Sequence, residues 1–232
     1  MINLYPASSR YSADHGWLKS NFSFSFADYY DPSNTEFGPM RVLNDDEIAG
    51  HRGFGAHPHR EMEIVSIVLQ GKLKHEDSTG RTAITGFGEV QRMSAGTGII
   101  HSETNPGEEE VHLMQMWFTP EEKGLEPSYE TTRYDVEAMK NALLPVVSKN
   151  PGENVARIHQ DMTIYLSDLE ARQSIGFQQP AGRRIFVFVI EGTLAINEQH
   201  VLGRRDSARI TETPELTLSS EGGARFMLID LP

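Results

Sequence analysis

The 232-residue sequence contains no cysteine. Disulfide bonds and thiolate metal ligands are therefore excluded, and a reducing, cytoplasmic setting is the simplest interpretation. The N-terminal residues show no charged segment followed by an apolar stretch, so no signal peptide is expected. No apolar run approaches the ~18 residues that a membrane-spanning helix needs, so no membrane association is expected either.

Basic residues are scarce as well. The 21 Lys and Arg residues are outnumbered by 33 Asp and Glu residues, which leaves a formal net charge of −12. Such a surface repels phosphate backbones, and no basic run or aromatic–basic pattern offsets that repulsion. Direct nucleic-acid binding is therefore not expected.

Helical periodicity is weak along the whole chain, because most apolar residues alternate or form short runs. Phe22, Phe24 and Phe26 predict the buried face of a strand within residues 21–30. Residues 63–84 and 111–119 are typical of further strands separated by glycine-containing turns. The best helix candidate spans residues 133–144. Strands at short, regular spacing predict an all-β fold, either a sandwich or a barrel.

A composition break divides the chain around residues 120–155, where "KNPGEN" interrupts the strand pattern. A short internal echo links the two sides, because "SIVLQGKL" at residues 66–73 is similar to "VFVIEGTL" at residues 187–194. Strand–glycine–strand is a common pattern, and one match can arise by chance. If the echo is real, it predicts two related β-barrels in tandem, over residues 1–130 and 131–232.

Histidines are concentrated in the first half, where six of the nine lie between residues 51 and 112. In a strand, residues i and i+2 point to the same side, so His57 and His59 project together, as do His101 and Glu103. Two such strands facing one another inside a barrel would present three imidazoles and one carboxylate to one point. These donors suit Fe, Mn, Co, Ni, Cu or Zn rather than Mg or Ca.

Two alternatives remain at this point. Each pair could be a solvated part of an ordinary strand, although two pairs of ligand-type residues in a cysteine-free chain favour a metal site. Glu63 shares the parity of His57 and His59, so spacing alone does not decide between Glu63 and Glu103 as the carboxylate ligand. His57 and His59 precede Gly71 in the first half of the echo. The residues at the same distances before Gly192 are Gln178 and Pro180, which are not histidines, so no metal is predicted in the second barrel.

Two longer segments resemble the motifs of the cupin superfamily. "GFGAHPHREMEIVSIVLQG" is similar to the first cupin motif, and "GEVQRMSAGTGIIHSETN" is similar to the second. Ser94 stands where the cupin pattern has proline, and two extra residues precede His101. Both departures are shared with the pirins. "HGWLKSNFSFSFADYYDP" and "RVLNDD" also resemble bacterial pirin-like proteins assigned as quercetin dioxygenases.

The resemblance to pirins implies a bicupin, with two jelly-roll barrels in tandem and one metal in the N-terminal barrel. It carries metal ligation to His57, His59, His101 and Glu103, and so favours Glu103 over Glu63. Glu63 would then either orient an imidazole or lie in solvent. One divalent transition metal is expected; iron is favoured, with Cu, Ni, Co, Mn and Zn as alternatives.

The resemblance also implies an activity, namely the opening of a flavonol heterocycle with O2 and the release of carbon monoxide. Glu103 would be catalytic by accepting the proton of the flavonol 3-hydroxyl. The protein is expected to be a monomer. The alternatives are a metal-dependent regulatory pirin that binds partner proteins, and a cupin acting on an unknown small molecule.

The expected substrate pocket is apolar. His15 and Trp17 are candidates for its mouth, although a histidine near a terminus more often faces solvent. No cluster of polar residues beyond the metal ligands stands out, so the pocket is expected to tolerate several flavonols. The residues expected to line the pocket or to pack the first barrel are Met93, Met114, Met116 and Trp117.

Overall fold

The computed structural model describes residues 1–232, and strands dominate it from end to end. The only helical elements are the 3₁₀ turns η1 (Ala7–Ser9) and η2 (Val136–Met139), so the all-β prediction is confirmed. Neither turn has the length or the apolar character that a helix needs to cross a membrane.

The helix expected over residues 133–144 is wrong apart from the single turn η2. The Asp135 carboxylate accepts a hydrogen bond from the backbone N–H of Glu137, which starts the turn. Only Met139 of this turn is buried, so packing does not extend it. The following apolar residues enter the strand β13 (Leu144–Ser148) instead.

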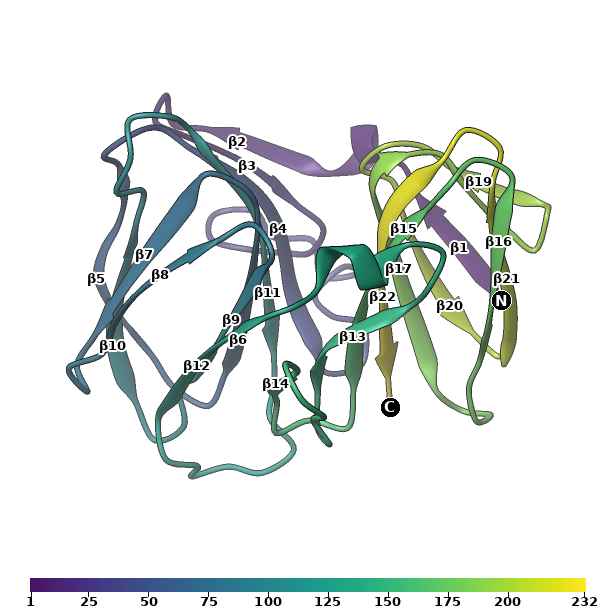
Figure 1. The fold of residues 1–232 in the computed structure, drawn as a ribbon. Helices are drawn as coiled ribbons and strands as arrows, with labels where there is room; N and C mark the ends of the chain where they lie inside the picture. Colours follow the sequence, from purple (N-terminus) through teal and green to yellow (C-terminus); the bar gives the residue numbers. More distant parts are fainter. The chain divides into compact units, whose positions relative to one another are not determined.

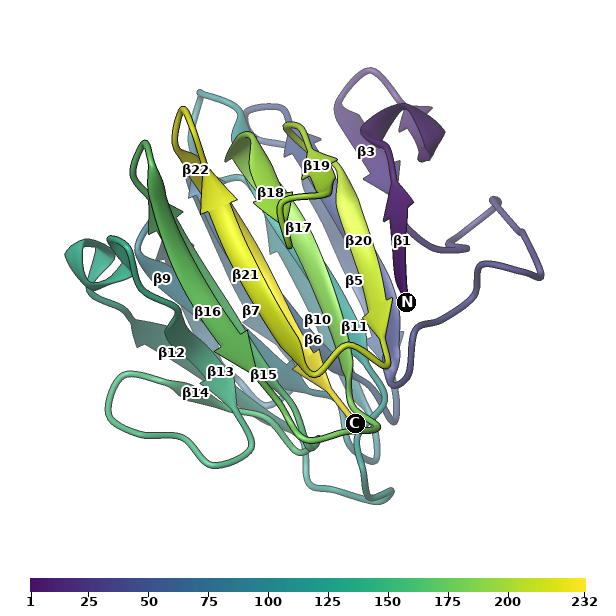
Figure 2. The same ribbon diagram turned by 90° about the vertical axis from the view of Figure 1, so that its right-hand side faces the viewer.

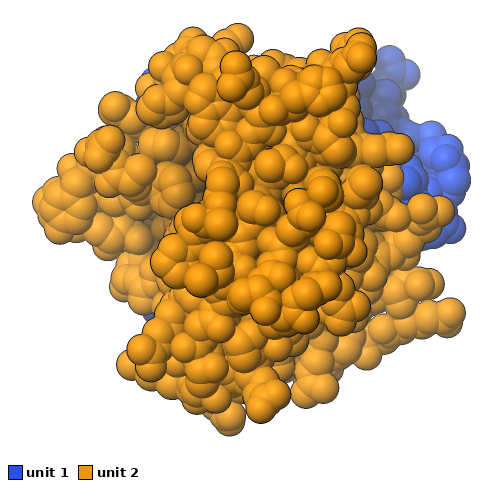
Figure 3. All heavy atoms as spheres, turned by 90° about the vertical axis from the view of Figure 1, so that its left-hand side faces the viewer, with its two compact units in different colours: residues 1–10, 135–148, 161–232 blue, residues 11–134, 149–160 orange.

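The chain forms two compact units, coloured separately in Figure 3. Residues 11–134 and 149–160 make one unit, here called the N-terminal barrel. Residues 1–10, 135–148 and 161–232 make the other, here called the C-terminal barrel. This division differs from the single boundary expected after residue 130.

Two short segments account for that difference. The strand β1 (Ile2–Tyr5) pairs antiparallel with β20 (Ser207–Thr211) of the C-terminal barrel, where it satisfies backbone groups that an edge strand would leave unpaired. Residues 149–160 join the N-terminal barrel through polar contacts, including a 2.5 Å ion pair between Lys149 and Glu121. Periodicity does not predict pairings of this kind.

The N-terminal barrel consists of two antiparallel sheets (Figure 1). The larger sheet has the order β12-β9-β6-β11-β4-β3-β2 and the smaller has the order β5-β10-β7-β8. Apolar residues from both sheets, among them Leu18, Val68 and Leu73, form one buried cluster that holds the sheets together. The bounds are β2 (Tyr11–Asp14), β3 (Leu18–Phe22), β4 (Met40–Ile48), β5 (Gly53–His59), β6 (Glu63–Gln70), β7 (Lys72–Asp77), β8 (Thr82–Gly86), β9 (Glu89–Ser94), β10 (Ile99–Thr104), β11 (Val111–Phe118), β12 (Ser128–Arg133) and β14 (Ala156–Arg157).

The phenylalanine repeat is only partly a strand. β3 ends at Phe22, and the chain beyond it turns, with one isolated bridge between Phe26 and Tyr29. Phe24 is 1% exposed and belongs to the core, as predicted.

The C-terminal barrel repeats this architecture (Figure 2), and a large cluster of buried apolar residues lies in it. Its larger sheet contains β1-β20-β17-β22-β15-β13 in that order, and its smaller sheet is β16-β21-β18-β19. The remaining bounds are β15 (Thr163–Leu169), β16 (Gln173–Gln178), β17 (Arg184–Gly192), β18 (Leu194–Ile196), β19 (His200–Leu202), β21 (Glu215–Ser220) and β22 (Ala224–Leu231).

The internal echo corresponds to the same turn in each barrel. Gly71 follows β6 with φ of 77°, and Gly192 ends β17 with φ of 80°. A Cβ atom at Gly71 would lie 2.9 Å from the Glu110 carbonyl oxygen, and one at Gly192 would lie 2.1 Å from that of Gly223. Both turns therefore require glycine, for the same two reasons.

Candidate metal centre and pocket

The two strands that carry the histidine pairs are direct neighbours in the smaller sheet of the N-terminal barrel. β5 and β10 pair antiparallel, with His57 opposite His101 and His59 opposite Ile99. The sequence led us to expect strands facing one another across the barrel, but adjacency brings the side chains together equally well. A β-bulge between His101 and Glu103 places Glu103 opposite Phe54, and bulges commonly redirect side chains in this way.

Three of the predicted residues meet at one point. The ring centroids of His57, His59 and His101 lie 4.5–4.8 Å from one another. Their potential ligand atoms all lie within 4.8 Å of one another, as do those of His75, His101 and Glu103. The two groups share His101 and are here called the histidine cluster, although Glu103 is grouped with His75 and His101 and not with His57 and His59. No comparable group occurs in the C-terminal barrel.

The protonation of these rings suits a transition metal. His57 Nδ1 lies 2.7 Å from the Gly55 carbonyl oxygen and must donate to it, so Nε2 keeps its lone pair. That Nε2 lies only 3.1 Å from His101 Nε2. His59 Nε2 is buried without a hydrogen-bond partner. Unprotonated nitrogens directed at one another are unfavourable unless a cation lies between them, so the cluster fits a divalent transition metal.

Burial supports the same conclusion. Burial and, to a smaller extent, the neighbouring His57 together lower the pKa of His59 to about 4. Burial, followed by the adjacent imidazoles, lowers the pKa of His101 to about 3. Both rings are therefore neutral near pH 7, which is the form that binds metals.

Glu103 is buried, and two glutamine side chains hold it. Gln91 and Gln115 each donate an amide N–H to one of its carboxylate oxygens, both at 2.6 Å. The Tyr129 hydroxyl donates to Gln91 Oε1, and the Trp117 indole donates to Gln115 Oε1. Both amides are thereby oriented with their NH2 groups toward Glu103. Burial raises the pKa of Glu103, and the two glutamine hydrogen bonds oppose that rise.

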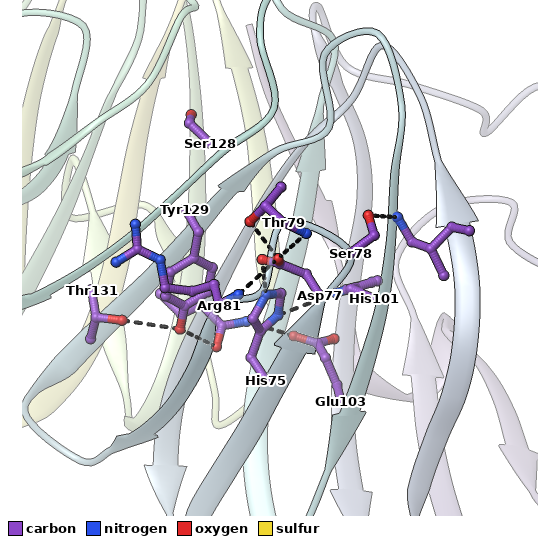
Figure 4. A network of polar contacts seen from close by, with 12 residues as sticks. His75, Asp77, Ser78, Thr79, Arg81, His101, Glu103, Ser128, Tyr129 and Thr131 are labelled. Carbon is purple, nitrogen blue, oxygen red and sulfur yellow. Dashed lines mark hydrogen bonds and ion pairs between the residues drawn. The ribbon is translucent and has the colours of Figure 1, made fainter.

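A chain of polar contacts reaches the Nδ1 side of the His101 ring (Figure 4). Asp77 and His75 lie on β7, which pairs with β10. Asp77 Oδ2 lies 2.8 Å from His75 Nε2, and both side chains are fully buried. The backbone N–H and the hydroxyl of Thr79 donate to the other Asp77 oxygen. His75 also stacks on Tyr129, with ring centroids 4.3 Å apart.

This chain selects one tautomer of His101. Because His75 donates Nε2–H to Asp77, its Nδ1 carries a lone pair, and that atom lies 3.4 Å from His101 Nδ1. His101 therefore donates through Nδ1, which leaves its Nε2 free on the side of His57. The sequence-based reasoning assigned no role to His75, Asp77, Gln91 or Gln115. The single signal was polar residues at inward positions of otherwise apolar strands, as in "EVQRMS" and "HLMQMW".

Glu63 takes part in a different cluster. It is fully buried, accepts the Ser94 hydroxyl at 2.5 Å, and accepts the backbone N–H and Nδ1 of His159 at 2.8 Å. The expectation that it lies in solvent is therefore wrong, and the imidazole that it contacts belongs to His159 and not to the histidine cluster. Ser94, which replaces the cupin proline, contributes to this separate anchor. His112, which lies outside the histidine cluster, pairs with Asp45 at 2.6 Å.

A cavity of about 410 Å³ opens beside the histidine cluster and reaches His57 and Glu103. That volume lies within the ~300–1,000 Å³ typical of small-molecule sites. Aromatic side chains make much of its wall, and His15 and Trp17 also lie on it, whereas Met93, Met114 and Met116 are fully buried elsewhere. The lining residues are His15, Trp17, Leu18, Ser20, Phe22, Phe26, Ala27, Asn44, Asp46, Phe54, His57, Glu103, Gln115 and Trp117.

The cavity is more polar than the sequence led us to expect. Ser20, Asn44, Asp46 and Gln115 all lie on its wall. Asp46 is 3% exposed, and burial raises its pKa to about 7, with nearby Asp45 and Glu103 adding to the rise and a hydrogen bond from Ser20 opposing it. Burying a carboxylate among other acids lowers the stability of the fold.

This cost has a measurable pH dependence. The folded protein binds the Asp46 proton more tightly than the unfolded chain, so the stabilisation from this proton is full below pH ~4 and is lost as the pH rises through about 7. Asp46→Asn should therefore stabilise the metal-free protein by ~2 kcal/mol more at pH 8 than at pH 5. Urea unfolding of both proteins at the two pH values measures this difference, and parallel pH profiles would refute it.

Comparison with known proteins places the chain in a family. Residues 6–118 match the pirin family, and residues 145–231 match the quercetinase C-terminal cupin domain. Quercetin 2,3-dioxygenase of Escherichia coli K12 is 40% identical over 233 residues, covering 100% of this chain and 99% of that protein. The crystal structure of E. coli YhhW matches with a TM-score of 0.95 at 40% identity, covering 100% of this chain and 98% of that chain.

A second structure of the same relative contains a metal. The bacterial pirin YhhW from E. coli in complex with nickel(II) matches with a TM-score of 0.94 at 39% identity, covering 100% of this chain and 99% of that chain. The bicupin fold implied by the resemblance to pirins is thus confirmed. The chain belongs to the pirin family of the cupin superfamily.

Proposed function

We propose that this protein is a metal-dependent dioxygenase that opens the heterocycle of flavonols such as quercetin with O2 and releases carbon monoxide. The observation that carries the proposal is the cluster of imidazoles and one carboxylate at the wall of a cavity that is partly lined by aromatic side chains. The E. coli relative named quercetin 2,3-dioxygenase, similar over its full length, supports the same activity.

Within this proposal, His57, His59, His101 and Glu103 hold one divalent transition metal. Iron remains the favoured ion, and the nickel complex of the E. coli relative supports nickel as an alternative. A bound metal would supply Lewis acidity toward the flavonol 3-hydroxyl and access to O2 chemistry. The protein supplies the rest: a cavity with aromatic walls for the flat substrate, its orientation, and a proton acceptor.

Glu103 is the proposed proton acceptor because it lies on the cavity wall beside His57. Gln91 donates a hydrogen bond to one Glu103 oxygen and Gln115 donates one to the other. The carboxylate therefore keeps its position when it takes the 3-hydroxyl proton. Catalytic groups need this kind of support to stay within reach of the reacting atom. Trp17 and Phe54, with ring centroids 5.6 Å apart, help to exclude water.

The support of His101 by His75 is testable separately. His75→Phe keeps a ring against Tyr129 but removes the acceptor for His101 Nδ1–H, so metal affinity should fall by ~10–100-fold. Competition with a chromophoric chelator measures the affinity. His112→Phe is the matched control, because it breaks a second His–Asp pair of this barrel that lies outside the cluster. Equal losses in both variants would mean general destabilisation rather than support of a ligand.

The activity itself is tested by aerobic incubation of the metal-loaded protein with quercetin. Purified protein would be loaded in parallel with Fe, Ni, Cu, Co, Mn or Zn, and loss of the flavonol absorbance followed. Turnover that requires one of these metals is the expected result. Absence of turnover with every metal would contradict the proposal and favour a regulatory pirin that binds partner proteins, or a cupin acting on another small molecule.

A further inference from the structure

We propose that Ser20, Asn44 and Asp46 form a recognition patch that binds the hydroxyl groups of the substrate's ring farthest from the metal cluster. The inference rests on the proposed function, because it specifies which flavonols the cavity accepts. It implies a preference for substrates with a hydroxylated distal ring over those in which this ring is bare or methylated.

The strand register builds the patch. Asn44 and Asp46 are two residues apart on β4, so they face the same side, and both line the cavity. Ser20 lies directly opposite Asp46 on the neighbouring strand β3. On the other side of β4, Gln115 of β11 lies opposite Asn44. Gln115 donates a hydrogen bond to Glu103, the proposed base. The patch therefore begins at Asn44, opposite Gln115, and extends away from there along β4.

The patch has unused capacity to accept hydrogen bonds. Asn44 is 3% exposed, and its Oδ1 is buried without a hydrogen-bond partner. Asp46 is also 3% exposed, and one of its oxygens accepts the Ser20 hydroxyl. Native proteins satisfy nearly all buried polar atoms, so an unsatisfied acceptor on a cavity wall indicates a partner that arrives with the ligand.

The chemistry of the patch determines that partner. The Asn44 amide oxygen requires a hydrogen-bond donor, so it favours phenolic hydroxyls over methoxy groups, which only accept. Phe22 and Phe26 border the same cavity and suit a flat ring. The tolerance expected from the sequence is accordingly replaced by selectivity, because a site built to hydrogen-bond a hydroxyl discriminates strongly against a ligand that lacks it.

The test is a binding measurement without turnover. Both tryptophans of the chain, Trp17 and Trp117, line the cavity, so quenching of their fluorescence reports occupancy. Metal-loaded protein under anaerobic conditions would be titrated with quercetin, with a flavonol whose distal ring is unsubstituted, and with one whose distal hydroxyls are methylated. We expect quercetin to bind ~10–100-fold more tightly than either analogue.

Variants connect that preference to the patch. Asn44→Leu removes the acceptor at similar size and should reduce the preference for quercetin to within ~3-fold, without weakening binding of the unsubstituted flavonol. Asn44→Ala serves as a second variant if the leucine does not fold. Asp45→Asn is the matched control, since Asp45 is adjacent in β4 but pairs with His112 and does not line the cavity.

The outcomes separate this inference from the proposed function. A preference retained in both Asn44 variants, or lost equally in Asp45→Asn, would overturn the patch. Selective binding of quercetin without turnover under any metal would support the patch while contradicting the proposed dioxygenase. Failure of the wild-type protein to bind any flavonol would reject both.

Discussion

Replacing both His57 and His59 by alanine is expected to leave the purified protein without bound transition metal, whereas the wild-type protein should contain about one ion per chain. The reason is the convergence of His57, His59 and His101 on one point, with His59 Nε2 buried and unpartnered. Removing two donors should weaken binding by at least ~100-fold. Elemental analysis after dialysis measures the stoichiometry.

The C-terminal barrel provides a control for this experiment. Gln178 stands where the internal repeat would have its first histidine, and it is the exposed last residue of strand β16. Gln178→Ala should therefore leave the metal content at about one ion per chain. A wild-type stoichiometry near two, or metal retained in the double-histidine variant, would show that the metal binds elsewhere.

Replacing Glu103 by glutamine is expected to lower both metal affinity and flavonol turnover by ~10–100-fold or more. The substitution removes the only carboxylate of the cluster and the proposed proton acceptor. It also places an amide NH2 against the NH2 group of either Gln91 or Gln115, which Tyr129 and Trp117 hold in place. Chelator competition and steady-state kinetics report the two losses separately.

Glu63→Gln makes the matching comparison, because Glu63 is the other carboxylate that the spacing allowed as a ligand. It bonds to Ser94 and His159, so its replacement should reduce thermal stability and leave metal affinity nearly unchanged. A larger loss of metal in Glu63→Gln than in Glu103→Gln would reverse the assignment and favour the general cupin pattern over the pirin one.

The sequence predicted the main features of the fold because they depend on short-range regularities. Alternation of side chains places His57 beside His59 and His101 beside Glu103, whatever the tertiary structure. The positive φ of Gly71 and Gly192 follows from a local turn, and it is visible as a repeated glycine between apolar strands. Family resemblance then supplied the bicupin architecture.

Other features depend on which strands become neighbours, and alternation does not specify that. The pairing of β7 with β10 places His75 behind His101, and the pairing of β3 with β4 places Ser20 beside Asp46. Each of these residues is isolated in the sequence and becomes part of a cluster only through long-range register. The same holds for Gln91 and Gln115, which are separated by 24 positions in the chain and meet at Glu103.

Segments without periodicity were the least predictable. Residues 149–160 contain few apolar positions, yet His159 of this segment reaches the buried Glu63. The N-terminal strand β1 was assigned to the first barrel by its position in the chain, whereas its hydrogen bonds go to β20 of the second. In both cases a specific distant partner determines the location.

The most direct test is the yield of carbon monoxide from metal-loaded protein and O2, measured with quercetin and with a flavone that lacks the 3-hydroxyl. Metal-dependent opening of the heterocycle predicts about one carbon monoxide per quercetin consumed, none from the flavone, and none after the metal is removed by chelation. Equal release from the flavone, or undiminished release from the metal-free protein, would contradict a dioxygenase that acts through this metal cluster.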